Sequence, residues 1–263
     1  MIGGTAPERP GLGAVPDPPR LPERFNGPPG SAHGGYACGR FAAATGLDQR
    51  TGVAVTLLRP PPLAVPLPMT RNGERWHAWQ GAEPVAGIAQ ARPDGGAPPP
   101  GVPHRTTRSC GAEDAATHPF PSCFVCGPQR ADGDGLRLFP RVARDQPDTV
   151  VVTWCPAPEF ADRGGLVRPE FLWAVLDCPG GWTVLGRSAR AHVLNRIAVV
   201  IHRRPAAGSP VVIVGRLEGL RERTATVSTA AYHGAELLAL ARAQWTAVDS
   251  ARFGAARGAA DPS

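Results

Sequence analysis

The second half of the chain contains five segments in which apolar and polar residues alternate, and this pattern constrains the fold most strongly. The segments are TVVVTW (149–154), IAVVIH (197–202), PVVIVGRLEGL (210–220), TATVSTAAY (224–232) and ELLALARAQWTAV (236–248). Alternation with a period of two is typical of strands that bury one face. One helix candidate, 169–181, follows the first segment. A helix followed by antiparallel strands predicts a sheet that wraps the helix and buries its apolar face.

Composition and charge argue against several classes of function. All 28 basic residues are arginine, and they are scattered, so the net charge of +6 at pH 7 does not indicate a nucleic-acid partner. The chain has no run of 18 apolar residues and no basic N-terminus followed by an apolar segment, which predicts neither a membrane span nor a signal peptide. We therefore expect a cytoplasmic protein whose six cysteines are not paired in disulfides.

Segments rich in proline and glycine divide the 263 residues into two ordered units. Residues 1–21 and 251–263 lack periodicity and are predicted to be disordered tails. Residues 92–121 have a similar composition and are predicted to be a linker. The predicted units are therefore 22–91 and 122–250.

Three matching anchors in the same order indicate that the second unit repeats the first. The pairs are Phe25 with Phe160, Arg59-Pro60 with Arg204-Pro205, and Gly81-Ala82-Glu83 with Gly234-Ala235-Glu236. The offset grows along the chain, which two loop insertions in the second half would explain. We therefore predict a duplicated unit of one helix and a four-stranded meander.

Several motifs are similar to those of a known superfamily. They are Ala32-His33-Gly34-Gly35 before the first helix, Leu176-Asp177 within the second, and Cys123–Pro128 with Asp134-Gly135-Leu136 ahead of the second unit. With the order of elements, they resemble the hotdog-fold superfamily of thioesterases and dehydratases, in its internally duplicated, double-hotdog form. The resemblance implies an α+β fold of two tandem hotdog units that pair as a pseudo-dimer. Each unit would hold a long central helix wrapped by an antiparallel sheet, although no leading strand is recognisable in the first.

The start of the first helix offers hydrogen-bond donors to a substrate carbonyl. A helix N-terminus has free amide groups and a positive dipole end, and glycine lets a ligand approach them closely. Gly34 and Gly35 fit this role, with His33 as a second donor. The alternative is that the glycines only permit a turn and that His33 only caps or packs the loop.

The resemblance implies an acid on the central helix about two turns after the loop glycine. Eight helical residues span about 12 Å, so donor and acid must come from different units. Ala42 stands at the acid position of the first helix and Asp177 at that of the second. Pro169, in the second loop, has no N–H to donate. The sequence thus predicts one composite site, in which Gly34 and Gly35 face Asp177.

Two alternatives to this acid remain open. Asp177 could end its helix and bond to the following Pro179-Gly180-Gly181 turn. Glu170, near the helix start, is a second acid, although early acids usually complement the dipole.

Related thioesterases imply further polar groups and a binding site for CoA. Gln244 matches their glutamine on the last strand, and Asn195 or Thr183 stands nearest to their strand threonine. For the phosphates of CoA we expect arginines, and those near matching strand ends are Arg59, Arg203 and Arg204.

The Cys123-x-x-Cys126 pair has the spacing of zinc ligands. His118, Cys110 or His104 could complete the set. The usual second pair is missing, and two buried thiols in a turn would give the same pattern. The prediction is therefore that the protein holds no metal and no cofactor.

Together these features predict an acyl-CoA thioesterase-like hydrolase. Its partner would be acyl-CoA or another acyl thioester, and the sequence leaves a homo-oligomer open. Asp177 would activate water, Gly34 or Gly35 would polarise the carbonyl, and Gln244 and Asn195 would orient the water. The alternatives are a non-catalytic binder of acyl or fatty ligands, and an enoyl-thioester dehydratase or hydratase that uses His33 with Asp177.

Overall fold

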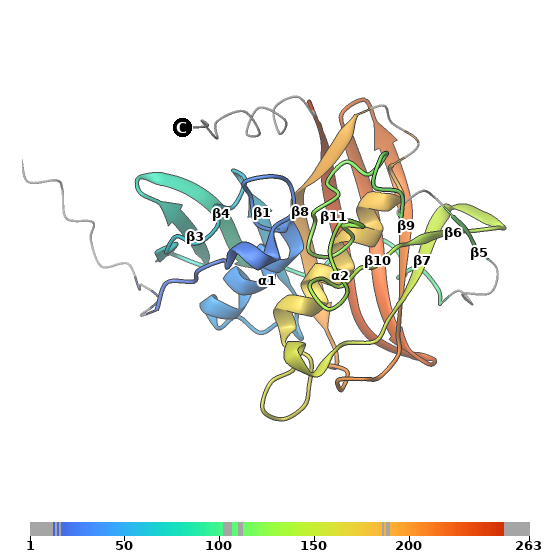
Figure 1. The fold of residues 1–263 in the computed structure, drawn as a ribbon. Coiled ribbons are helices and arrows are strands. Elements are labelled where there is room, and N and C mark those ends of the chain that lie inside the picture. Colours follow the sequence, from blue (N-terminus) through green and yellow to red (C-terminus); the bar gives the residue numbers. More distant parts are fainter. Residues whose placement is uncertain are drawn as a thin grey trace, which may run out of the picture.

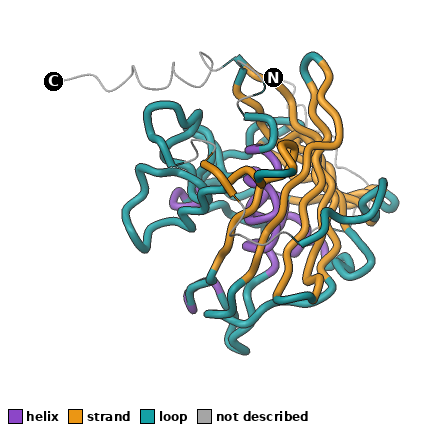
Figure 2. The backbone as a smooth tube through the Cα atoms, turned by 90° about the vertical axis from the view of Figure 1, so that its right-hand side faces the viewer, coloured by secondary structure: helices purple, strands orange, loops and turns teal. Residues whose placement is uncertain are grey.

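The chain forms one curved antiparallel sheet with two α-helices on the same face. The computed structural model describes residues 13, 15, 17–101, 107–109, 113–185, 187 and 190–249. Figure 1 shows the helices side by side in front of the sheet, and Figure 2 shows the strands of the same sheet edge-on beside them. The helices are α1 (Gly34–Thr45) and α2 (Pro169–Trp182), with 12 and 14 residues. The α+β class is as predicted, but the helices are of ordinary length rather than long.

Eleven strands make up the sheet within the described residues. They are β1 (Val53–Leu57), β2 (Met69–Asn72), β3 (Arg75–Gln80), β4 (Glu83–Gln90), β5 (Thr107–Ser109), β6 (Arg141–Ala143), β7 (Gln146–Trp154), β8 (Ala191–Ile201), β9 (Val211–Arg221), β10 (Thr224–His233) and β11 (Glu236–Val248). Their order in space is β2-β3-β4-β1-β8-β11-β10-β9-β7-β6-β5. The five alternating segments of the second half correspond to β7 to β11.

The order of the strands repeats outward on both sides of the central pair β1 and β8. These strands are antiparallel neighbours, with Val53 opposite Val199. Outward from β1 come β4, β3 and β2, and outward from β8 come β11, β10 and β9. Each half therefore places one helix and its four following strands in the same spatial order.

The loops that lead into the two helices have the same backbone geometry. The His33 amide donates to the Phe25 carbonyl at 2.8 Å, and the Arg168 amide donates to the Phe160 carbonyl at 2.9 Å. Short 3₁₀ turns end at Phe25 and at Phe160. The offset of 135 residues predicted from the sequence thus relates equivalent atoms of the two loops.

The strand ends correct the sequence alignment by one residue. The Arg59 amide donates to the Val85 carbonyl at 3.3 Å, and the Arg203 amide donates to the Leu238 carbonyl at 3.0 Å. Arg59 therefore corresponds to Arg203, and not to Arg204 as the repeated Arg-Pro suggested. Loop insertions shift a local match in this way because the strand hydrogen bonds, rather than identical letters, set the equivalence.

Part of the predicted N-terminal tail packs against the sheet. The Val15 amide donates to the Met69 carbonyl, and the Leu67 amide donates to the Pro19 carbonyl. Leu21 is fully buried. This segment lies beside β2, as β7 lies beside β9, so it takes the place of the leading strand that the sequence did not reveal. Prolines at 18 and 19 have no N–H to pair, which hides the strand signal. The rest of the tail (1–12, 14 and 16) and the predicted tail at 251–263 lie outside the described residues.

The predicted linker is held on the surface where the structure describes it. The Tyr232 hydroxyl donates to the Pro99 carbonyl at 2.7 Å, and Arg216 donates to the Ala97 carbonyl at 3.2 Å. Residues 107–109 of the same stretch add the edge strand β5. Side-chain bonds from the second half therefore fix the course of the described part of this segment.

The two helices approach each other closely because α1 is rich in glycine. A Cβ atom on Gly39 would lie 2.6 Å from the Glu170 Cα and 3.0 Å from the Trp173 Cβ. Glycine is a weak helix former, so packing rather than intrinsic propensity stabilises α1. The Trp173 side chain is fully buried, and its indole donates to Gln49 Oε1 at 2.9 Å, which ties α2 to the segment after α1.

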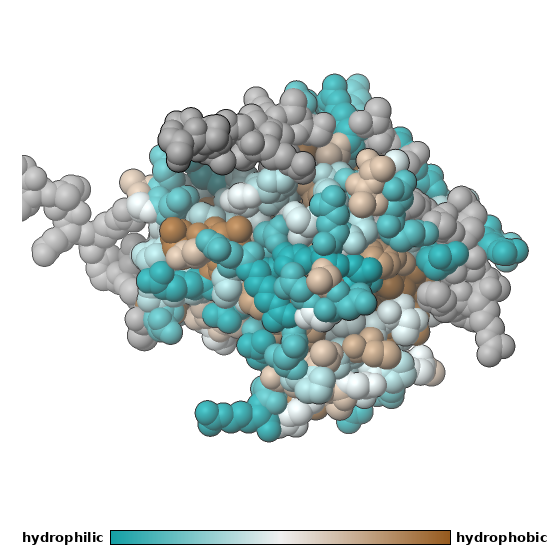
Figure 3. Space-filling model, in the orientation of Figure 1, coloured by the Kyte–Doolittle hydropathy of each residue, from teal (hydrophilic) through white to brown (hydrophobic). Residues whose placement is uncertain are grey.

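The remaining surface carries no large apolar area on the face seen in Figure 3, where hydrophilic residues dominate and hydrophobic patches are small and separate. The large apolar side chains that are exposed in the described chain are Leu58, Leu166 and Leu220, which come from three different segments. Within the same residues, no helix has the length and apolar character needed to span a bilayer.

Because Trp173 packs between the helices, we expect it to stabilise both halves together. Trp173→Ala should lower the free energy of unfolding by about 3–5 kcal/mol. Trp173→Phe keeps the aromatic packing and should cost about 1–2 kcal/mol. Urea unfolding followed by circular dichroism measures both variants. Two separate transitions, of which Trp173→Ala shifts only one, would show that the halves are independent.

Candidate active site

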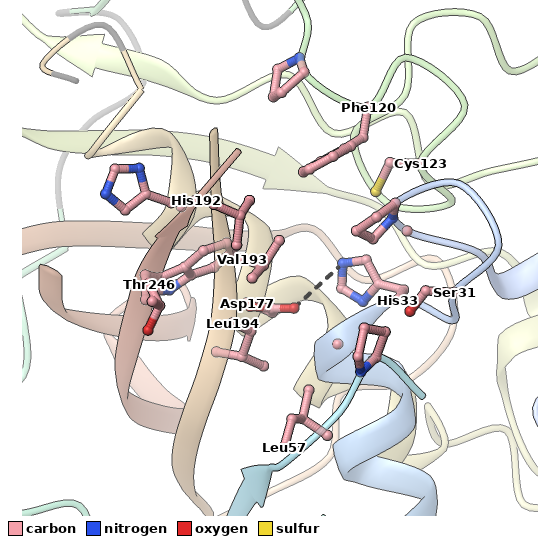
Figure 4. A pocket seen from close by; sticks show the side chains of 18 of the residues that line it. Ser31, His33, Leu57, Phe120, Cys123, Asp177, His192, Val193, Leu194 and Thr246 are labelled. Atoms are coloured by element: carbon pink, nitrogen blue, oxygen red, sulfur yellow. Dashed lines mark ion pairs between the residues drawn. The ribbon is translucent and has the colours of Figure 1, made fainter. Parts of the chain in front are cut away.

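A cavity of about 730 Å³ lies between the two halves of the chain. Its walls come from the loop before α1, the end of β1, the loop at 118–126, the second half of α2, and strands β8 and β11. Figure 4 shows that Asp177 and His33 point toward each other in it, with Cys123 above His33. The walls are mostly apolar, as in pockets that bind small organic ligands.

Asp177 is the acid of this cavity. Its side chain is buried within α2, and its Oδ2 accepts a hydrogen bond of 2.6 Å from the Gly35 amide. Its Oδ1 is also buried and has no hydrogen-bond partner among the described residues. Because α2 continues to Trp182, the alternative in which Asp177 ends the helix is wrong. The second oxygen is therefore left for a water or a ligand group in the cavity.

Burial controls the protonation of Asp177. Desolvation raises the pKa of this carboxyl to about 6, while the nearby His33 and the Gly35 N–H act in the opposite direction. A carboxylate with such a pKa is ionised near neutral pH and is basic enough to accept a proton from water in a reaction.

His33 caps α1 and also faces the acid. Its Nδ1 accepts a hydrogen bond of 3.2 Å from the Tyr36 amide, so in the neutral ring the proton sits on Nε2. That Nε2 lies 3.1 Å from Cys178 Sγ and 3.6 Å from Asp177 Oδ2. Burial lowers the pKa of His33, but the Cys123 thiol and the Asp177 carboxyl outweigh this effect, and the pKa is raised overall.

The two predicted glycine donors differ in their roles. The Gly35 amide is engaged by Asp177, so it positions the acid. The Gly34 amide has no hydrogen-bond partner among the described residues, and Gly34 lines the cavity. Gly34 is therefore the donor that remains for a substrate oxygen at the positive end of α1.

Asn195 lies at the cavity, whereas Gln244 and Thr183 do not line it. The side chain of Asn195 faces the cavity from β8 and donates to the Leu57 carbonyl at 3.5 Å. Asn195 is the extra residue of a β-bulge, because Gln244 pairs with Arg196 and the next residue of β11 pairs with Leu194. Gln244 is exposed and points to the opposite face of the sheet, because alternation directs its buried neighbours toward the helices. Gln244 therefore lies away from the cavity in which it was expected to orient water.

Glu170, the second acid considered from the sequence, is also away from the cavity. Glu170 is buried at the start of α2, where its carboxylate lies 3.7 Å from both Arg40 and Arg168. It does not line the cavity. Its ion pairs account for its burial without a catalytic role.

Of the predicted arginines, Arg59 alone lines the cavity. It forms an ion pair with Glu83, and Arg203 forms the corresponding pair with Glu236 at 3.0 Å. Arg204 pairs with Asp162 at 2.6 Å. Arg203 and Arg204 are therefore surface ion-pair residues, and the expectation that they bind substrate is not supported by their positions.

Arg223 lines the cavity, although the sequence analysis did not select it. Its side chain donates to the Ala247 carbonyl at 3.2 Å. It lies in the turn between β9 and β10, and no local motif in the sequence signals that this turn borders the cavity.

Comparison with solved structures identifies the fold. A protein of unknown function from Alicyclobacillus acidocaldarius, described as having a hotdog fold, matches 84% of this chain and 88% of its own, with 13% identity and a TM-score of 0.53. The chain has the hotdog fold. Neither a scan against protein families nor a search among curated proteins gave a match.

Two shorter structures match parts of the chain. The PaaI protein of Escherichia coli, from the phenylacetic acid degradation operon, covers 43% of this chain and 81% of its own, with 14% identity and a TM-score of 0.39. The smu.793 protein of Streptococcus mutans, solved with acetyl-CoA, covers 39% of this chain and 83% of its own, with 14% identity and a TM-score of 0.37.

The hotdog geometry predicts different costs for two neighbouring substitutions in α1. A Cβ on Gly35 would lie 2.5 Å from Asp177 Cβ and 2.6 Å from the Trp173 carbonyl, whereas a Cβ on Gly34 would meet the flexible Leu194 side chain at 3.1 Å. Gly35→Ala should destabilise the protein by about 1–3 kcal/mol, and Gly34→Ala by less than about 1 kcal/mol. Urea unfolding measures both, and equal costs would contradict the close contact at Gly35.

Proposed function

We propose that this protein hydrolyses acyl thioesters, with acyl-CoA as the substrate class, at one composite site between its two halves. The observation that carries the proposal is Asp177, which lines the cavity and whose Oδ1 atom is buried without a hydrogen-bond partner among the described residues. A buried polar atom of this kind is costly unless something binds to it. A water bound there would lie against a base with a pKa of about 6.

An internal duplication explains why donor and acid lie on different halves. The mirrored strand order and the matched bonds that precede the helices support a tandem pair of hotdog units. In this proposal the two hotdog units comprise residues 22–91 and 122–250. In such a pair, each helix would bring its acid position to the loop of the other unit.

The reaction divides between Asp177 and Gly34. Asp177 would take a proton from water while the water oxygen attacks the thioester carbon. The Gly34 amide and the positive end of α1 would stabilise the negative charge that develops on the carbonyl oxygen. When the C–S bond breaks, the proton on Asp177 would pass to the leaving thiolate, which releases a free thiol and a carboxylic acid.

The equivalent position on the other side cannot support this chemistry. The buried Ala42 has no acidic group, and Pro169 at the start of α2 has no N–H to donate. Arg168 and Glu170 form an ion pair there instead, at 3.7 Å. One active site per chain is therefore expected.

The thioesterase proposal is tested by thiol release from a panel of acyl-CoA esters. Asp177→Asn should lower kcat/KM by about 100- to 10,000-fold, because it removes the base and preserves the volume. Asp145→Asn, at an exposed turn, is the matched control and should behave as the wild type. Hydrolysis by Asp177→Asn at the wild-type rate would exclude Asp177 as the base.

A hydratase is the second candidate, because His33 Nε2 and Asp177 Oδ2 lie 3.6 Å apart at the cavity. Such a pair could move a proton to or from a substrate carbon. Incubation with an enoyl-CoA ester separates the two activities, since hydration consumes the double bond without releasing thiol. Binding of acyl-CoA without either reaction would instead identify a non-catalytic binder.

A further inference from the structure

Three thiols and one imidazole from separate segments of the chain converge in the wall of the cavity. Cys178 Sγ, on α2, lies 3.9 Å from Cys123 Sγ, 3.3 Å from Cys126 Sγ and 3.1 Å from His33 Nε2. The ligand atoms of His33, Cys123 and Cys178 all lie within 4.8 Å of one another. All four side chains are buried. The mechanism proposed above uses none of the three cysteines.

These distances are those of a tetrahedral metal site rather than of disulfides. Thiolates bound to zinc at about 2.3 Å lie about 3.8 Å apart, and a thiolate and a histidine nitrogen lie about 3.6 Å apart. The three separations around Cys178 Sγ, of 3.9, 3.3 and 3.1 Å, lie within about 0.5 Å of these values. A disulfide would need sulfur atoms about 2.05 Å apart, and all four cysteines described in the interior are free.

We propose that Cys123, Cys126, Cys178 and His33 Nε2 bind one Zn²⁺ ion. Thiolate and imidazole donors favour zinc over hard cations such as magnesium and calcium. This set keeps Cys123 and Cys126 from the sequence candidates and replaces the others with Cys178 and His33. Among the described residues, His118 is not one of the donors that lie within 4.8 Å of one another, and its ring packs on Trp182. Cys110 and His104 lie outside the described residues.

The loop at 120–127 is shaped to present two thiols together. The Cys123 amide donates to the Phe120 carbonyl at 2.9 Å, and the Gly127 amide donates to the Cys123 carbonyl at 2.8 Å. A Cβ on Gly127 would lie 2.5 Å from the Cys123 backbone, so this turn requires glycine.

Coordination requires a change in the proton position of His33. With zinc on Nε2, the ring proton moves to Nδ1, and the capping bond from the Tyr36 amide is lost. The loss of one cap is small compared with the binding free energy of a structural zinc site. A zinc-bound His33 could not act as the proton donor of a hydratase, so zinc binding would favour the hydrolase.

The ion would join three parts of the molecule. His33 precedes α1, Cys123 and Cys126 lie in the loop before the second half, and Cys178 follows Asp177 on α2. Zinc would therefore fix the position of the acid relative to the Gly34 donor. The zinc site does not depend on which reaction occurs at the cavity.

Metal analysis of the full, untagged chain tests the proposal. After dialysis we expect one zinc per chain, and cobalt substitution should give the visible bands of tetrahedral Co²⁺ with thiolate-to-metal charge transfer. Cys126→Ser and Cys178→Ser should lose the stoichiometric metal. The matched controls are Cys155→Ser, at an exposed cysteine, and Cys38→Ala, at a buried cysteine outside the cluster, and both should keep it.

Several results would overturn the site. One is wild-type protein that contains no zinc after purification and after refolding in the presence of zinc. Another is a full zinc content in Cys178→Ser. The third is a Cys126–Cys178 disulfide in protein purified under reducing conditions. If the cysteine variants fail to fold, zinc-edge X-ray absorption of the wild type decides. Three sulfur neighbours and one nitrogen support the site, whereas nitrogen and oxygen neighbours alone indicate adventitious zinc. Unchanged binding by His33→Ala would remove His33 from the ligand set.

Discussion

The contact between α1 and α2 determines most of what this molecule can do. At Gly35 the two helices are so close that the backbone amide of one meets the carboxylate of the other at 2.6 Å. A side chain at this position would separate them. The same contact buries Asp177, raises its pKa, and places it beside the start of α1. The core, the acid and the mouth of the cavity therefore share one constraint, which is the absence of a Cβ atom in α1.

The two halves have the same frame and different chemistry. Their loops and strand ends share backbone bonds, but one contributes glycine amides and the other contributes the acid. Because both halves lie in one chain, equivalent positions of the two can carry different residues. Ala42 and Pro169 are the residues at which this asymmetry is visible.

Much of the fold could be predicted from the sequence, because its signals are local. The alternation of β7 to β11 and the start of α2 at a proline are examples, and the pairing of Asp177 with the glycine loop followed from the repeat. The failures have physical causes. Strand alternation turned Gln244 away from the cavity, and ion pairs hold Arg203 and Arg204 at the surface. No local pattern announces that Cys178 meets Cys123, because their approach depends on how a loop packs against a helix.

The proline-containing segment along β2 affects how readily this edge of the sheet can pair with another molecule. An open sheet edge with unpaired amides can recruit a strand from another molecule and start aggregation. Here the outermost chain at that edge includes Pro18 and Pro19, which have no N–H, and its Pro19 carbonyl is already engaged by the Leu67 amide. The segment covers the edge of the first half without offering a regular new one. The described part of this segment therefore offers few free amides to another strand.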